Sequence, residues 1–167
     1  MALGSNLGDS AGTLRKALAR LSEDRRFHLE KVSSLYRTRP WGKTDQPDFI
    51  NAAALAGWEG TPEELMAFFL QVEKEFGRKR EVHWGPRTLD LDLIYSKQVE
   101  SDTEFLRLPH PYFWERPFVL VPLEEILPDF TYKKETIHER ILALDGYSEI
   151  VKMGKESGNE CRCKGEE

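Results

Sequence analysis

The residues best suited to chemistry lie between Gly77 and Leu93. In the second half of this stretch, Asp90 and Asp92 alternate with leucines, which is the period-two pattern of a strand with one face on a core. Both carboxylates therefore lie on one face, roughly 6.6 Å apart. Two ionised carboxylates at that spacing repel by about 2 to 3 kcal/mol at a protein-like effective dielectric. Such a pair either lies in open water or binds a cation.

The first half of the same stretch is basic. It contributes four positive side chains, namely Arg78, Lys79, Arg80 and Arg87. Arginine and lysine could hold phosphate oxygens, arginine through its bidentate fork. Asp90 and Asp92 suit Mg²⁺, which takes few protein carboxylates and completes its shell with water and substrate phosphates. Together these residues form the set that phosphoryl transfer requires, although solvent-exposed acids remain the alternative for the aspartate pair alone.

The hydrophobic pattern predicts the elements that position this stretch. The expected strands are 1–3, 27–36, 49–58 and 89–93, and the expected helices follow Asp9 and Thr61. Thr61 to Glu64 is a capping box, and Gly77 ends the second helix. The order of strands and helices predicts an α+β fold, a ferredoxin-like split βαβ sheet with helices packed on it. A short buried helix or strand at 118–127 and a last helix near 137–144 would be appended C-terminal elements.

Composition predicts one domain at 1–151 and a polar, disordered tail at 152–167. The chain has 167 residues and a formal net charge of -5, which argues against a general nucleic-acid surface. It contains no apolar run of membrane-spanning length, and its N-terminus lacks the features of a signal peptide. Cys161 and Cys163 lie in the tail, so the fold does not depend on disulfides. We expect a cytoplasmic monomer that binds small molecules, not nucleic acid or membrane.

A long connection and several aromatic residues suggest a second ligand. Residues 38–48 are rich in turn formers and longer than a hairpin requires, which is typical of a functional loop. Gly42-Lys43-Thr44 imitates the end of a P-loop, but Arg37 stands where glycine is needed and no helix pattern follows. Two facing rings could hold a flat heterocycle, although each ring could equally belong to the core. The aromatic residues near the loops are Trp41, Phe49, Trp84 and Phe118.

Several motifs occur in an order that resembles one known family. They are Gly4-Ser5-Asn6-Leu7-Gly8, Tyr36-Arg37-Thr38, Asp45 to Ala53, Trp84-Gly85-Pro86-Arg87-Thr88-Leu89-Asp90-Leu91-Asp92 and Leu108-Pro109-His110-Pro111. Together they resemble the 6-hydroxymethyl-7,8-dihydropterin pyrophosphokinases of folate biosynthesis, from residue 2 to about 128. The resemblance implies transfer of pyrophosphate from ATP to the pterin hydroxymethyl group, with release of AMP.

The resemblance also implies roles for individual residues. Asp90 and Asp92 would bind two Mg²⁺ ions. Phosphate or nucleotide contacts would come from Arg78, Arg80, Arg87, His110 and Arg116, with Glu73 at the nucleotide site. The pterin would lie between Phe49 and Phe118, with Trp84 closing over the site. Its polar edge would be read by Asn51 and by the backbone around Thr38 and Gly42.

Two other functions stay open at this point. One is another Mg²⁺-dependent phosphotransferase or nucleotidyltransferase with two aspartates on a ferredoxin-like strand, which would release ADP or pyrophosphate instead of AMP. The other is an RNA-binding module that uses exposed aromatic residues on such a sheet. The net charge of -5 and the aspartate pair argue against RNA binding.

Overall fold

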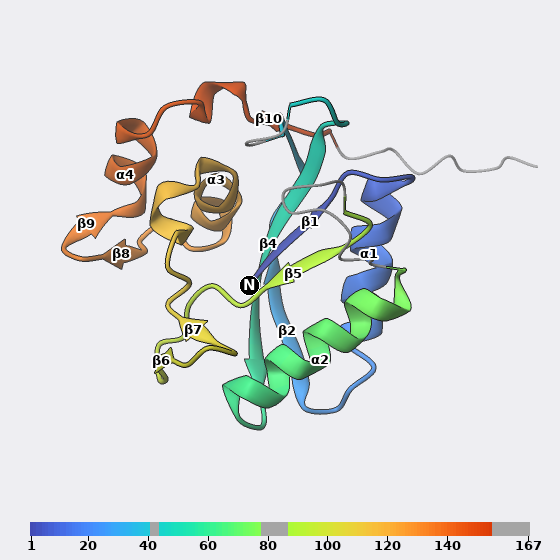
Figure 1. The fold of residues 1–167 in the computed structure, drawn as a ribbon. Helices are drawn as coiled ribbons and strands as arrows, with labels where there is room; N and C mark the ends of the chain where they lie inside the picture. Colours follow the sequence, from blue (N-terminus) through green and yellow to red (C-terminus); the bar gives the residue numbers. More distant parts are fainter. Residues whose placement is uncertain (41–43, 78–86, 155–167) are drawn as a thin grey trace, which may run out of the picture.

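An antiparallel sheet forms the middle of the molecule in the computed structural model, which describes residues 1–40, 44–77 and 87–154 (Figure 1). The strands are β1 (Ala2–Ser5), β2 (Phe27–Val32), β3 (Tyr36–Thr38), β4 (Phe49–Trp58), β5 (Asp90–Asp92) and β10 (Val151–Lys152). Their order is β10-β3-β4-β1-β5, with β2 paired to the C-terminal half of β4. The central pair β1 and β4 therefore holds the site strand β5 at one edge.

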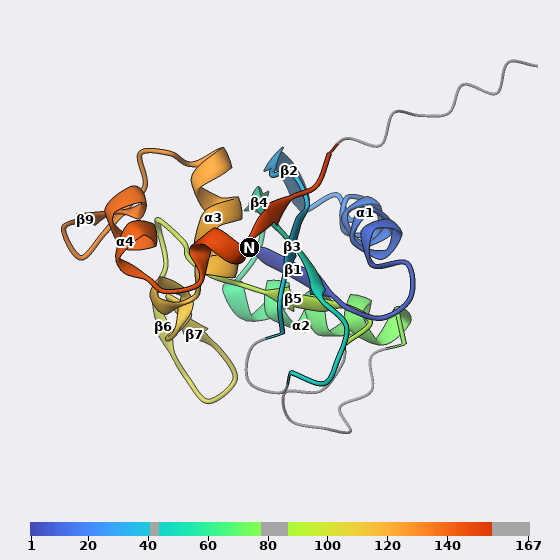
Figure 2. The ribbon, with the colours of Figure 1, turned by 90° about the horizontal axis from the view of Figure 1, so that it is seen from above.

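Helices cover both faces of this sheet, so the fold is α+β. They are α1 (Ser10–Leu21), α2 (Pro62–Glu75), α3 (Pro117–Ile126) and α4 (Ile137–Ala143). Seen from above in Figure 2, α1 and α2 lie on one side of the sheet and α3 and α4 on the other. Within the described ranges, no helix combines the length and apolar character needed to cross a bilayer.

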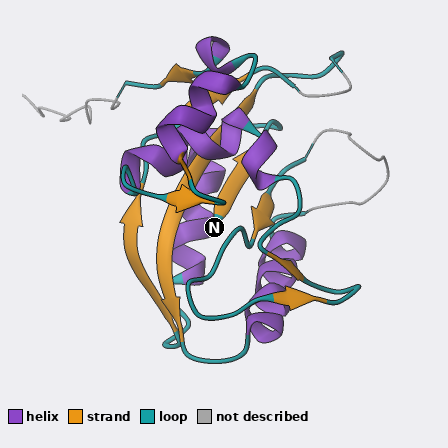
Figure 3. Ribbon diagram, turned by 90° about the vertical axis from the view of Figure 1, so that its left-hand side faces the viewer, coloured by secondary structure: helices purple, strands orange, loops and turns teal. Residues whose placement is uncertain are grey.

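Short elements complete the half of the molecule around α3 (Figure 3). Two small hairpins consist of β6 (Ser101–Asp102) with β7 (Arg107–Leu108) and of β8 (Thr131–Tyr132) with β9 (Glu135–Thr136). Two 3-10 turns are η1 (Phe113–Glu115) and η2 (Tyr147–Glu149). Aromatic side chains from η1 and β8 pack with buried residues of α3 and α4 in a second apolar cluster, separate from the one under α1 and α2.

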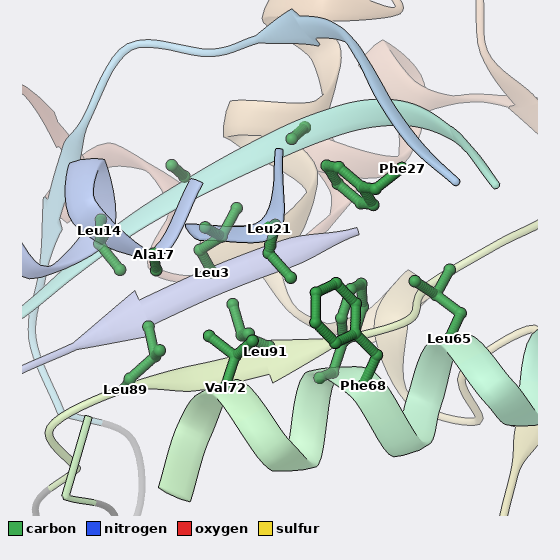
Figure 4. Packing of buried hydrophobic residues seen from close by; sticks show 13 residues of the cluster. Leu3, Leu14, Ala17, Leu21, Phe27, Leu65, Phe68, Val72, Leu89 and Leu91 are labelled. Atoms are coloured by element: carbon green, nitrogen blue, oxygen red, sulfur yellow. The ribbon is translucent and has the colours of Figure 1, made fainter. Parts of the chain in front are cut away.

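The first apolar cluster explains the orientation of the two site aspartates. Leu89 and Leu91 are 0 % exposed and pack against α1 and α2, together with Leu3 of β1 (Figure 4). Because side chains alternate across a strand, Asp90 and Asp92 must lie on the opposite face of β5. The predicted leucine–aspartate alternation is confirmed.

The helix beginnings also agree with the sequence. At α2, the Thr61 hydroxyl accepts from the Glu64 N–H at 3.2 Å, and the Glu64 carboxylate accepts from the Thr61 N–H at 2.8 Å. These two bonds satisfy donors that a helix start leaves without intrahelical partners. Gly77 follows the helix with φ +78°, a conformation that favours glycine.

The predicted strand 27–36 is wrong, because it divides into β2 and β3. The Ser33 N–H donates to the Ala53 carbonyl at 2.9 Å, but the Ala53 N–H is taken by the Ser33 hydroxyl at 2.9 Å. A side chain thus replaces the backbone acceptor, and the ladder is interrupted before it resumes at Tyr36. As a result, β2 pairs with residues 54–58 of β4 and β3 pairs with residues 49–51.

The C-terminal predictions have mixed outcomes. The segment 118–127 is helical, as α3, and the last predicted helix is α4. Lys152, assigned to the tail from sequence, belongs to β10, and the Met153 N–H donates to the Leu35 carbonyl at 2.8 Å. The remaining predicted tail, 155–167, lies outside the described residues, so its disorder stays a prediction.

We expect Leu91→Ala to lower the free energy of unfolding by about 2 to 5 kcal/mol, because it leaves a cavity in the cluster under β5. Urea denaturation followed by circular dichroism measures this change. Phe105→Ala is the control, since Phe105 is 51 % exposed and its truncation should have a much smaller effect. Equal effects of the two substitutions would contradict the packing described for Leu91.

Candidate active site

A cleft of about 540 Å³ lies between the β1–β4–β5 part of the sheet and the start of α3. It is lined by nine of the predicted site residues, Thr38, Phe49, Asn51, Arg87, Asp90, Asp92, His110, Arg116 and Phe118. These residues come from strands, a loop and a helix that are far apart in sequence, and the fold brings them to one cavity. Four other predicted residues, Gly42, Arg78, Arg80 and Trp84, lie outside the described residues, and their roles stay predictions.

A second groove, of about 700 Å³, lies between the end of α1 and the side of α2, away from this cleft. Its charged side chains are paired with near neighbours. Arg20 bonds to Glu75 at 2.8 Å, and Arg26 bonds to Asp24 at 2.9 Å while its guanidinium lies 4.5 Å from the Trp58 ring centroid. The cations of this groove are paired, and no predicted site residue lines the groove. The smaller cleft is therefore the candidate active site.

Asp90 and Asp92 carry an unfavourable concentration of negative charge. The pKa of Asp92 is raised to about 7, first because burial penalises the carboxylate and then because Asp90 repels it. Arg116 and Arg87 oppose the rise, whereas Glu73 adds to it. Arg87 also donates directly to Asp90 through Nη1. The protein's own cations therefore neutralise the pair only in part, and a bound cation would complete the neutralisation.

The donor set at this position fits Mg²⁺. In the part of the chain that the structure describes, no three His, Cys, Asp or Glu side chains gather as a metal-binding group. An all-protein zinc cage is thus absent there. Mg²⁺ differs, because it is commonly held by one or two carboxylates and takes its other ligands from water and phosphates. Asp90 and Asp92 supply those two carboxylates.

Glu73 is placed differently from the sequence prediction. It is 2 % exposed, does not line the cleft, and accepts from the Leu91 N–H through Oε1 at 2.8 Å. Leu91 pairs with β1 on its other side, so the glutamate satisfies a donor on the outer edge of β5. Glu73 therefore supports the strand between the two aspartates from behind, and its contact with a nucleotide stays a prediction.

Arg116 and His110 present donors to the cleft. The buried Arg116 Nε has no hydrogen-bond partner among the described residues, and a buried donor of this kind is costly unless a ligand satisfies it. The pKa of His110 is lowered to about 4, mainly by burial and then by the positive charge of Arg116. The neutral ring accepts from the Tyr112 N–H at Nδ1, 3.3 Å away, so its proton lies on Nε2. Both side chains are suited to an anion.

The other end of the cleft combines rings with a fixed amide. Phe49 enters it from β4 and Phe118 from the first turn of α3. Asn51 donates from Nδ2 to the Thr38 hydroxyl at 2.7 Å, which sets the orientation of the amide. A Cβ at Gly4 would lie 2.9 Å from the Asn51 Oδ1, so the glycine makes room for this side chain. This end suits a flat ligand with polar edges.

Sequence reasoning missed Asn6, which joins the segments around the cleft. Its Oδ1 accepts from the Arg87 N–H at 2.8 Å, and its backbone N–H donates to the Arg87 carbonyl at 3.0 Å. Its Nδ2 donates to Gln46 Oε1 and to the Pro47 carbonyl, both at 3.0 Å. The motif Gly4-Ser5-Asn6-Leu7-Gly8 was the available signal, but a local motif does not indicate which distant segments Asn6 joins.

Comparisons with known proteins agree with this geometry. Residues 1–128 match the family described as 7,8-dihydro-6-hydroxymethylpterin-pyrophosphokinase (HPPK). The 2-amino-4-hydroxy-6-hydroxymethyldihydropteridine pyrophosphokinase of Methylorubrum extorquens is 43% identical over 145 residues, 87% of this chain and 92% of that protein. The Bacillus subtilis protein of the same name is 47% identical over 126 residues, 75% of each chain. A folate synthesis bifunctional protein of Pisum sativum is 39% identical over 127 residues, 76% of this chain and 24% of that protein.

We expect Asp92→Asn to raise the melting temperature at pH 8 in metal-free buffer. The pKa of Asp92 rises from 3.8 to about 7 on folding. Between these two pH values the folded state binds more protons than the unfolded state, so the free energy of unfolding falls as pH rises through this range. The asparagine carries no such penalty, and the gain should vanish below the ordinary pKa of aspartate. Differential scanning calorimetry at several pH values measures it.

Asp102→Asn is the matched control for this measurement. The Asp102 side chain is 93% exposed, and its nearest charged partner is Arg107 at 3.6 Å, so its loss should change stability little. A lower melting temperature of Asp92→Asn than of the wild type at pH 8 would contradict the electrostatic account of the aspartate pair.

Proposed function

This chain belongs to the 7,8-dihydro-6-hydroxymethylpterin-pyrophosphokinase family, and we propose that the cleft beside β5 is where it performs the reaction of that family. The enzyme is an ATP-dependent pyrophosphokinase of folate biosynthesis. It transfers pyrophosphate from ATP to the hydroxymethyl group of 6-hydroxymethyl-7,8-dihydropterin and releases AMP. The observation that carries this assignment is a single cavity lined by an acidic pair, by hydrogen-bond donors suited to an anion and by two aromatic rings.

The phosphate end of the cleft is proposed to hold Mg²⁺ and the ATP triphosphate. Asp90 and Asp92 would bind two Mg²⁺ ions, which when bound supply positive charge to the phosphate oxygens. Arg116 Nε and His110 Nε2 would donate to phosphate or nucleotide oxygens, since both are donors without a role in the fold. Arg87, already bonded to Asp90, would contact phosphate beside that carboxylate.

The remaining predicted phosphate contacts belong to the same proposal. Arg78 and Arg80 would hold phosphate oxygens and Trp84 would cover the site, as the resemblance of their motif implies. They precede Arg87 in the chain, and Asn6 holds Arg87 at the cleft by accepting from its N–H. Glu73 is proposed to support β5 from the side away from the cleft, by accepting from the N–H of Leu91, which lies between Asp90 and Asp92.

The aromatic end is proposed to bind the pterin. Phe49 and Phe118 would lie against the two faces of the flat ring. Asn51, held by Thr38, would bond to the polar edge, with the backbone near Thr38 and Gly42. In this arrangement the pterin hydroxyl meets the ATP β-phosphate near β5. Positioning and electrostatic stabilisation then supply most of the catalysis, so no strong side-chain base is required.

We also propose that the sheet is of the ferredoxin-like type. The order β5-β1-β4 followed by β2 and β3, all antiparallel, supports this, as do α1 and α2 on one face. The interruption at Ser33 and the added β10 are departures from the simplest form of that sheet. A cytoplasmic monomer is proposed as the working unit, because one cleft accommodates both small substrates without nucleic acid or membrane.

The direct test incubates the protein with ATP, Mg²⁺ and the hydroxymethyl pterin and separates the nucleotide products. AMP and the pyrophosphorylated pterin are the expected products. ADP would instead indicate a kinase, and release of free pyrophosphate would indicate a nucleotidyltransferase. A preparation that consumes no ATP with pterin present would contradict the proposed function.

We expect Asp92→Asn to abolish AMP formation at saturating Mg²⁺, since it removes a proposed metal ligand while keeping the side-chain size. Its raised stability in metal-free buffer would show that the loss is not caused by unfolding. Isothermal titration calorimetry with Mg²⁺ and an unreactive ATP analogue should show weaker metal-dependent binding. A turnover rate near that of the wild type would refute the metal role of Asp92.

Phe118→Ala should weaken pterin binding by about tenfold or more while changing ATP affinity little, because an aromatic face and its apolar area are lost on one side. Fluorescence titration with each ligand separately measures the two affinities. Tyr112→Ala, which removes an exposed ring that also lines the cleft, tests whether the loss of any ring there has this effect. Equal losses for pterin and ATP would argue against Phe118 as a pterin contact.

A further inference from the structure

Glu125, near the C-terminal end of α3, is bonded to the strands across from it. Its Oε2 accepts from the Ser34 N–H at 3.0 Å and from the Tyr36 hydroxyl at 2.6 Å. Its Oε1 accepts from the Ser34 hydroxyl at 2.8 Å and from Lys152 Nζ at 3.2 Å. One carboxylate thus joins α3 to the segment before β3, to β3 itself and to β10.

The protonation states make this connection a charged one. Burial alone would raise the pKa of Glu125, but the bonds from Tyr36, Ser34 and Lys152 outweigh it and lower the pKa to about 2. Burial raises the pKa of Tyr36, and the bond to Glu125 raises it further. The glutamate is therefore ionised and the phenol protonated near neutral pH. Hydrogen bonds with an ionised partner are shorter and stronger than neutral ones.

The two elements that Glu125 joins carry opposite walls of the cleft. Tyr36 begins β3 and Thr38 ends it, directly opposite Phe49 of β4. Thr38 in turn orients Asn51. At the other end of α3, Phe118 and Val119 line the cleft. The polar wall and the ring on α3 are therefore separate elements whose relative position must be set outside the cleft.

Apolar packing alone does not fix that position. Leu120, Leu123 and Ile126 hold α3 against the sheet, but hydrophobic contact is non-directional and tolerates small slides and rotations. Hydrogen bonds are directional and fix register. A second bond at the same place, from Lys31 Nζ to the Ile126 carbonyl at 3.3 Å, acts in the same sense.

We propose that Glu125 is a positioning residue for the pterin, which it serves by fixing the end of α3 to β3 and thereby setting Phe118 against Thr38 and Asn51. Glu125 does not line the cleft and touches no substrate. The inference rests on the proposed function, because it concerns the pterin end of that same site. Of the proposed phosphate contacts, Arg87, Asp90 and Asp92 lie on β5 or just before it and do not depend on α3, whereas Arg116 directly precedes α3.

The test is the KM for each substrate in the Glu125→Ala enzyme, measured by AMP formation. We expect the pterin KM to rise by about tenfold, the size of effect typical of losing a hydrogen-bonded charge. The ATP KM should rise by a smaller factor than the pterin KM, because Arg116 is the one proposed phosphate contact at the start of α3, and kcat should stay within about threefold of the wild type. Glu125→Gln should restore most of the pterin affinity, because its amide oxygen can still accept from Ser34 or Tyr36.

Glu124→Ala is the matched control. Glu124 is the neighbouring residue on α3 and also loses a charged contact, because its Oε1 lies 2.8 Å from His138 Nδ1. That contact joins α3 to α4, not to β3, so the pterin KM should not change. If Glu125→Ala does not fold, Tyr36→Phe removes the 2.6 Å bond alone and should raise the pterin KM by a smaller factor, about threefold.

Several outcomes would overturn the proposal. They are an unchanged pterin KM in Glu125→Ala or Tyr36→Phe, parallel losses for pterin and ATP, and an equal effect of Glu124→Ala. Each of these leaves wild-type AMP formation intact and so leaves the proposed function standing. Absence of AMP formation by the wild type would instead overturn the proposed function, and the two failures are distinguishable.

Discussion

The repulsion between Asp90 and Asp92 is the constraint around which the site is arranged. Two leucines on the same strand are buried under α1 and α2, so neither carboxylate can turn away without exposing the core. Arg87 contacts one of them, Arg116 lowers the cost for the other, and a raised pKa remains on Asp92. The fold thus keeps incompletely compensated negative charge beside β5, and under the proposed function Mg²⁺ with phosphate would compensate it.

The cleft depends on a few polar side chains that join distant segments. Asn6 connects the turn after β1 with the segment at Arg87 and with the loop at Gln46 and Pro47. Glu125 makes an equivalent connection on the opposite side, between α3 and β3. Both are largely withdrawn from the cleft itself. The residues proposed to contact ligands are therefore held by others that have no proposed contact with a ligand.

Local patterns in the sequence were sufficient for some features and not for others. The alternation at β5 and the capping box at Thr61 depend on residues two or three apart, and the structure confirms both. Asn6 and Glu125 depend on partners 27 to 91 positions away, which no local pattern can reveal. The hydrophobic pattern did not predict the break at Ser33, because the break arises where a serine hydroxyl accepts in place of a backbone carbonyl. Glu73 was assigned to the nucleotide site from the resemblance, and its position off the apolar stripe of α2 gave no sign of its burial.

The strand β10 connects the C-terminal segment to β3, which carries one wall of the cleft. Residues 151–152 lie beyond the span that matches the family, yet they pair with β3 and bring Lys152 to Glu125. Under the proposed function, substitutions in this segment would act on the acceptor wall through β3 and Glu125 without touching the proposed phosphate contacts. Related enzymes could in this way diverge in acceptor affinity while their nucleotide end stays the same.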